Sequence, residues 1–171
     1  GIRVINRKGQ SGEEYSMALY CLIDEAQAEL YVVDYPARKI QVYDLEGNYK
    51  RGFKFAGEGY YDEFYNYDTE HILCCTTDLN TVPNKSSHLV ISKQDGSVVR
   101  EITFPYEGEA IELVVRKGEM VLEGPFYQTV PVADGWELIQ PSADTIYHFE
   151  QDGQLTPSIV RTPPVHSMEP V

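Results

Sequence analysis

The stretch ELYVVDYPARKIQVYDLEGNYKR, residues 29–51, decides the fold class. Two β-rich runs, at residues 30–33 and 40–43, flank the short polar segment DYPARK, and neither run keeps the apolar spacing of a helix. Both runs are therefore predicted to be strands joined by a short loop. The second strand meets DLEGN, where Gly47 can adopt the positive φ of a tight hairpin turn, so YKRGFKF is its expected partner strand.

The same strand–turn–strand pattern occurs twice more further along the chain. HLVISKQDGSVVREITF at residues 88–104 and DTIYHFEQDGQLTPSIV at residues 144–160 each place an acidic residue and a glycine in the turn. The turn glycines Gly47, Gly96 and Gly153 are separated by 49 and 57 residues. Because β-propeller blades repeat every ~40–50 residues and contain four strands each, the period predicts a propeller.

The predicted fold class is all-β, with propeller blades that are four-stranded antiparallel meanders. We expect one partial propeller domain over residues 1–171, with units at about 17–58, 60–106 and 110–162 and the end of a preceding blade and its interblade loop at 1–16. That is about three blades plus a leading strand. Six blades of ~45 residues need roughly 270 residues, so self-association of the chain, or missing blades from a longer chain, is expected to complete a ring.

Two stretches interrupt the repeat. Residues 76–87 (TTDLNTVPNKSS) are polar and rich in turn formers, and are expected to be a loop. Residues 125–144 (PFYQTVPVADGWELIQPSAD) are expected to be a longer excursion, preceded by the first strand of the third unit in AIELVVRKGEMVLEG.

Composition excludes several classes of partner. The chain carries 27 acidic and 14 basic residues for a net charge of −13, so it repels phosphate backbones and no nucleic-acid partner is expected. No apolar run approaches the ~18 residues of a membrane helix, so no membrane-spanning segment is expected. Three cysteines, Cys21, Cys74 and Cys75, are too few and too unevenly spaced for a disulfide framework, and their redox state is left open.

Candidate catalytic and metal residues each have a structural interpretation. In HILCC, residues 71–75, strand alternation puts His71 and Cys75 on one face about 13 Å apart, too far to share a zinc ion. The cysteines are expected to be buried core residues. Asp34 follows an apolar strand and is expected to fix the adjoining turn through backbone N–H groups, as are Asp24 and Asp68.

No complete catalytic constellation is present in the sequence. The signatures of the common nucleophiles, phosphate loops and zinc proteases are missing, and the adjacency of Ser87 and His88 does not by itself place a hydroxyl on an imidazole. The acidic pairs at residues 13–14 and 62–63 lack the spacing of a calcium loop. We therefore predict no catalytic residue, no metal ligand and no cofactor.

Aromatic residues interspersed with carboxylates offer a different kind of site. Rings in connectors can stack on sugars or grip a peptide, although blade cores also need aromatic residues. The predicted ligand-binding residues are Glu14, Tyr15, Tyr60, Tyr61, Phe126, Tyr127 and Trp136.

Three stretches resemble a known family. RKGQSGEEYSM at residues 7–17, the stretch at residues 29–51 and DTIYHFEQDGQLTPSIV are similar to six-bladed β-propellers of the NHL and TolB-like kind, most closely those of Bacteroidales cell envelopes. The resemblance implies an exported protein, periplasmic or anchored to the outer membrane. The expected function is a non-enzymatic binding or scaffold module whose channel mouth takes a protein, a peptide or a glycan. The alternative is a propeller hydrolase or lyase that uses channel carboxylates, with or without Ca²⁺.

Overall fold

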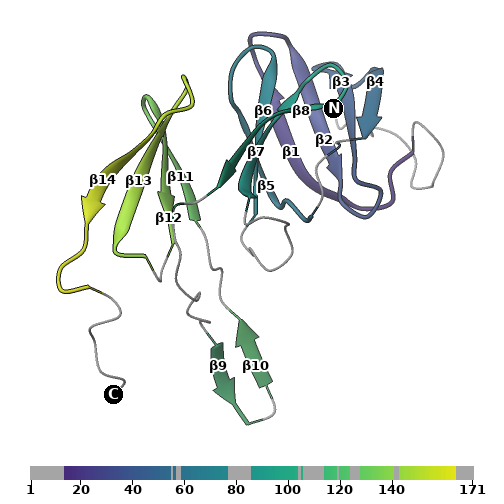
Figure 1. Ribbon diagram of the computed structural model, residues 1–171. Coiled ribbons are helices and arrows are strands. Elements are labelled where there is room, and N and C mark those ends of the chain that lie inside the picture. Colours follow the sequence, from purple (N-terminus) through teal and green to yellow (C-terminus); the bar gives the residue numbers. More distant parts are fainter. Residues whose placement is uncertain are drawn as a thin grey trace.

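Every regular element in the part of the chain that the structure describes is a β-strand (Figure 1). The computed structural model describes residues 14–54, 56, 59–76, 86–103, 105, 114–118, 120–123, 128–140 and 143–164.

Residues 29–51 form the middle of a four-stranded antiparallel sheet. Its strands are β1 (Ala18–Asp24), β2 (Glu29–Asp34), β3 (Lys39–Asp44) and β4 (Tyr49–Lys54), paired in chain order. The β3–β4 turn uses Gly47 at a φ of 86°, in the left-handed region that glycine adopts without steric cost. The predicted meander is confirmed.

Two further sheets repeat this order. The second contains β5 (Glu63–Asn66), β6 (His71–Cys75), β7 (Ser86–Ser92) and β8 (Val98–Thr103). The third contains β11 (Gln128–Val132), β12 (Gly135–Ile139), β13 (Thr145–Glu150) and β14 (Leu155–Val160). Three successive four-stranded antiparallel sheets confirm the predicted fold class, a partial β-propeller.

The first strand of the third sheet lies later in the chain than the repeat predicts. AIELVVRKGEMVLEG instead contains β9 (Val114–Lys117) and β10 (Met120–Glu123), which pair with each other and stand apart from the three sheets in Figure 1. The expected excursion at residues 125–144 supplies β11 and β12. Pro131 is a residue that argues against a strand, because proline cannot donate a backbone hydrogen bond to a neighbouring strand. It is tolerated in β11 because β11 is an edge strand of its sheet.

The second sheet lies between the other two and packs on both. Ile72 and Cys74 join the core shared with the first sheet, whereas Leu73 and Cys75 join the core shared with the third. The predicted alternation of HILCC is therefore confirmed, and both cysteines are buried free thiols, while Cys21 is an exposed free thiol.

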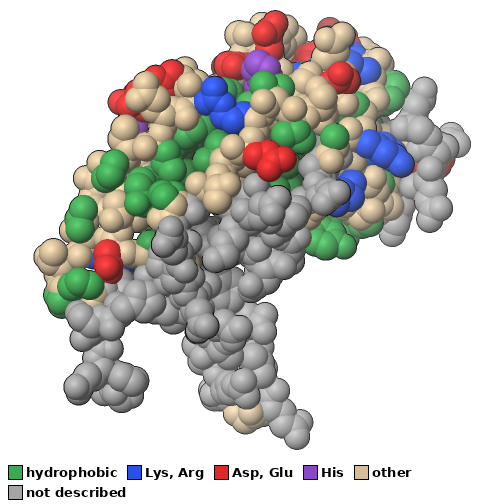
Figure 2. Space-filling view, viewed as in Figure 1, with side chains coloured by type: hydrophobic (Ala, Val, Ile, Leu, Met, Phe, Trp, Pro, Cys, Tyr) green, Lys and Arg blue, Asp and Glu red, His purple; other side chains and the backbone are tan. Residues whose placement is uncertain are grey.

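Antiparallel pairing gives each sheet two distinct ends. The turn end carries the β1–β2, β3–β4, β5–β6 and β7–β8 turns. The connector end carries the β2–β3 turn and the β4–β5 connection. In the third sheet the turn end holds the β11–β12 and β13–β14 turns, and Figure 2 shows acidic side chains gathered there, along the upper edge of the view.

Candidate functional site

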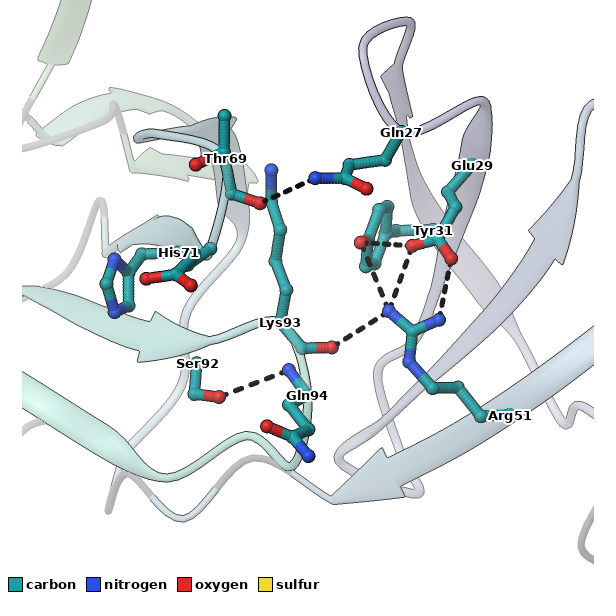
Figure 3. A pocket seen from close by; sticks show the side chains of 10 residues that line it. Gln27, Glu29, Tyr31, Arg51, Thr69, His71, Ser92, Lys93 and Gln94 are labelled. Atoms are coloured by element: carbon teal, nitrogen blue, oxygen red, sulfur yellow. Dashed lines mark hydrogen bonds and ion pairs between the residues drawn. The ribbon is translucent and has the colours of Figure 1, made fainter.

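A pocket of about 330 Å³ opens at the turn end, between the first and second sheets (Figure 3). Three turns and four strands contribute polar side chains to its wall, so it is a site made by the packing of two sheets rather than by one loop. The lining residues are Gln27, Glu29, Tyr31, Arg51, Thr69, Glu70, His71, Ser92, Lys93 and Gln94.

On the first-sheet side of the pocket, several polar side chains bind the carboxylate of Glu29. Arg51 donates to both carboxylate oxygens, at 2.7 and 2.9 Å, Lys50 forms a further ion pair, and the Tyr31 hydroxyl donates at 2.6 Å. The hydrogen bonds from Arg51, with those from Lys50 and Tyr31, outweigh burial and lower the pKa of Glu29 to about 2. Glu29 is therefore a fixed anion throughout the physiological pH range.

Lys93 joins the two sheets on the other side of the pocket. Its Nζ donates to Asp24 Oδ2 at 2.5 Å and to the Asp68 carbonyl at 2.7 Å, and its own carbonyl accepts from Arg51 at 3.1 Å. Both ends of the Lys93–Asp24 pair are almost fully buried. Burial opposes ionisation of Asp24, but the hydrogen bonds from Lys93 and the Gln27 backbone outweigh it, and its pKa lies below the usual value.

Two other polar side chains of the pocket, Gln27 and His71, make contacts that involve no buried ion pair. Gln27 Nε2 lies 3.5 Å from the Thr69 carbonyl, a long contact that bridges the two sheets. His71 Nδ1 lies 2.8 Å from Asp68 Oδ2, which also orients the imidazole. The arrangement combines fixed charges with amide and imidazole groups near solvent, a chemistry suited to hydrogen-bonding a polar ligand.

The connector end of the first sheet is organised around Asp34. This buried carboxylate accepts hydrogen bonds from the Ser16 backbone and hydroxyl, at 2.8 and 2.7 Å, and from the Met17 backbone at 3.1 Å. Asp34 therefore has a structural role, as expected, but it holds the strand that enters β1 rather than its own turn. Burial opposes its ionisation, and the Ser16 and Met17 hydrogen bonds bring its pKa below the usual value.

Two tyrosines meet beside this anchor. Tyr35 in the β2–β3 turn and Tyr60 in the β4–β5 connection have ring centroids 5.5 Å apart and planes tilted by 36°. Tyr60 is 53% exposed, which is high for so large a ring. The Tyr35 backbone N–H donates to the Met17 carbonyl, so its position depends on the Asp34 anchor.

Comparison with known proteins gives the repeated sheets a family. A family model described as a six-bladed β-propeller matches residues 1–170. The chain belongs to the six-bladed β-propeller family. A comparison with curated proteins found no match.

A solved propeller supports the same fold. A predicted exported protein of Bacteroides fragilis superposes with a TM-score of 0.62 at 12% sequence identity, over 91% of this chain and 41% of that protein. At this identity the likeness concerns the fold alone, and the chain spans less than half the length of the B. fragilis protein. The described residues contain no helix long and apolar enough to span a membrane.

Two of the predicted site residues, Glu14 and Tyr15, lie in the segment that leads into β1. The Glu14 carbonyl accepts hydrogen bonds from Lys39 at 2.5 Å and from Gln41 at 3.1 Å on β3. Sequence reasoning missed Tyr35, although its place directly after Asp34, in a turn beside the connector, was the available signal.

Other predicted residues have packing roles or lie outside the description. Tyr61 is 1% exposed and belongs to the core between the first two blades. Trp136 is 4% exposed and stacks on Tyr67 at 5.5 Å, between the second and third blades, so its faces are closed to a ligand. Phe126 and Tyr127 lie outside the described residues.

Ser87 and His88 form a buried chain between the second and third blades. Ser87 Oγ lies 2.6 Å from His88 Nδ1, and His88 Nε2 lies 2.9 Å from Thr129 Oγ1. All three residues are buried, and burial lowers the pKa of His88 to about 3. The serine hydroxyl does reach an imidazole, but neither group is accessible to a substrate. The hydrogen bonds of Ser87, His88 and Thr129 therefore serve to join two blades.

Metal-ligating groups do not converge in the described ranges. No cluster of three or more His, Cys, Asp or Glu side chains suited to a metal ion occurs among those residues. His71 pairs with Asp68 rather than with a cysteine.

Proposed function

We propose that this propeller is a non-enzymatic binding or scaffold module of the bacterial cell envelope, with a protein, peptide or glycan as its ligand. The family and the exported B. fragilis relative support an envelope propeller. Binding rather than catalysis is supported by the chemistry of the pocket between the first two blades.

The observation that carries the proposal is the state of Glu29. A general acid or base needs a pKa near the working pH and a proton that it can exchange. Glu29 instead has a pKa of about 2 and is held by Arg51, Lys50 and Tyr31. Such a group gives a fixed charge pattern, which orients a bound ligand and moves no proton.

A hydrolase or lyase is the second candidate, and Glu63 favours it. Glu63 begins β5, the first strand of the second blade, and burial raises the pKa of its carboxyl, with a further contribution from Asp62. A carboxyl with a raised pKa can serve as a general acid. Cleavage of a glycosidic bond usually needs a second carboxyl about 5–9 Å away, so Glu63 alone does not make a glycosidase.

The two candidates separate when binding and turnover are measured on the same samples. The purified protein is incubated with soluble polysaccharides and with peptides, and bound ligand and new chain ends are quantified together. Saturable binding with no new ends supports the binding module. New ends that are lost in Glu63→Gln, with the folded structure retained, overturn it in favour of the enzyme.

We further propose that additional blades complete the ring, either from a longer chain or from a second copy of this one. The third blade supports this, because Val130 and Val132 on β11 are 41% and 40% exposed, while Thr129, which precedes Val130 on the same strand, faces the second blade. An exposed apolar sheet face favours a covering partner. Light scattering tests this proposal: a particle of one 19.4 kDa chain with no added blades contradicts it.

A further inference from the structure

We propose that Tyr35 and Tyr60 form a platform that binds a sugar ring of a neutral glycan at the connector end of the first two blades. The inference rests on the proposed binding function and adds to it a ligand class and a second site, at the opposite end of the sheets from the Glu29 pocket.

The platform is built from two blades and held by fixed contacts. Tyr35 belongs to the β2–β3 turn of the first blade, whereas Tyr60 precedes β5 of the second blade. The rings meet at 5.5 Å, and their 36° tilt makes a shallow angle rather than a flat stack. Asp34 fixes Ser16 and Met17, and Met17 in turn accepts from the Tyr35 backbone, so the backbone that carries Tyr35 is positioned before any ligand arrives, and the Tyr60 ring packs on Tyr35.

The core between the blades does not account for Tyr60. The neighbouring Tyr61 is 1% exposed and fills that core, and Tyr20 packs against Phe64 with ring centroids 5.8 Å apart. Tyr60 remains 53% exposed, so more than half of its surface is in contact with solvent. An aromatic ring that leaves this much apolar surface in water on an ordered frame is available to a partner.

A sugar fits this platform better than an extended peptide does. Strand addition, one common mode of peptide binding, needs an open sheet edge, whereas Tyr35 and Tyr60 lie in a turn and a connector. The C–H face of a sugar ring can lie on a tyrosine, while its hydroxyl groups need hydrogen-bonding groups at the side. Asp62 and Arg38 provide charge close to Tyr35. The net charge of −13 disfavours acidic glycans, which leaves neutral ones.

Affinity electrophoresis on native gels tests the platform directly. The gels contain galactomannan, xyloglucan, mixed-linkage β-glucan or dextran, and the proteins are the wild type, Tyr35→Ala, Tyr60→Ala and the double variant. Tyr49→Ala is the matched control, because Tyr49 is also an exposed tyrosine (37%) of the first blade but begins β4 at the turn end. The fluorescence of Trp136, buried between the second and third blades, reports whether each variant folds.

The expected result is retardation of the wild type by at least one polysaccharide and an apparent affinity about tenfold lower in each single variant, since truncating an aromatic anchor removes most of its contact. Tyr49→Ala should migrate like the wild type. Equal retardation of the wild type and the double variant overturns the platform but leaves the binding function standing. Binding of a proline-rich decapeptide without any polysaccharide overturns the glycan class alone. Cleavage of a polysaccharide overturns the proposed function itself.

Discussion

Arg51 and Arg100 make the same contact in successive blades. Arg51 on β4 lies opposite Val42, and Arg100 on β8 lies opposite Val90, so the two occupy equivalent register positions. Each donates at 3.1 Å to a backbone carbonyl in a turn of the next blade, Arg51 to Lys93 and Arg100 to Asp152. The repeat in the sequence is thus also a repeat of the contact that joins the blades.

The two arginines should nevertheless contribute differently to the free energy of unfolding. Arg51→Met leaves the buried Glu29 carboxylate without its bidentate partner, so the free energy of unfolding should fall by about 2 kcal/mol. Arg100→Met removes an exposed hydrogen bond and should cost about 0.5 kcal/mol or less. Urea unfolding of both variants measures the difference. Equal losses would show that Glu29 does not depend on Arg51.

The buried Lys93–Asp24 pair should be strongly coupled. Lys93→Met leaves the Asp24 carboxylate buried without its cation, and the expected loss is about 3–5 kcal/mol. Asp24→Asn with Lys93→Met removes both charges, so the double variant should be more stable than the sum of the single losses predicts, by about 1–3 kcal/mol. Additive losses in the double-mutant cycle would mean that the two residues act independently.

His88 should make the protein less stable in mild acid. Its folded-state pKa of about 3 lies below the unfolded value of about 6.5, so the native state favours the neutral imidazole. Its contribution is complete above pH 6.5 and is lost as the pH falls from 6.5 towards 3. Between pH 7.5 and 5 the free energy of unfolding should fall by about 2 kcal/mol. His88→Gln should flatten this dependence; an unchanged slope in the variant would contradict the assignment.

Gly135 should not accept a side chain, whereas Gly52 on β4 of the first blade should. A Cβ at Gly135 would lie 2.2 Å from the Phe149 carbonyl oxygen, which the β12–β13 pairing holds in place. Gly135→Ala should therefore cost about 1–3 kcal/mol. Gly52→Ala is the matched control, because its nearest contact is the movable end of Tyr49, and a change within about 0.5 kcal/mol is expected. Thermal melts of both variants would reveal equal effects if packing around Gly135 were loose.

Local chemistry explains how far the sequence could predict the fold. The turn glycines Gly47, Gly96 and Gly153 all have positive φ, at 86°, 74° and 87°, and each closes a hairpin where the pattern placed it. Alternation along HILCC predicted which residues face which core. These features depend on neighbouring residues, so a linear sequence contains them.

The pocket depends on hydrogen-bonded pairs of residues that are distant in the chain. Patterns among neighbouring residues could not predict these pairs. Lys93 meets Asp24 from 69 residues away, and Arg51 reaches the Lys93 carbonyl across 42 residues. The sequence pattern singled out Tyr60 as a ligand residue but gave no reason to select Tyr35, the ring that packs against it. Aromatic content alone does not distinguish an exposed ring from a buried one, which is why Tyr61 and Trp136 appeared with Tyr60 among the predicted ligand residues.

A single equilibrium experiment tests the central claim that this propeller binds its ligand without transforming it. Wild-type protein and Glu63→Gln are titrated with the polysaccharide that retards migration, and free ligand and new chain ends are followed in the same tubes. We expect saturable binding that is equal for both proteins, with the polysaccharide recovered at full length. Progressive shortening by the wild type that stops in Glu63→Gln would contradict it and identify the propeller as an enzyme.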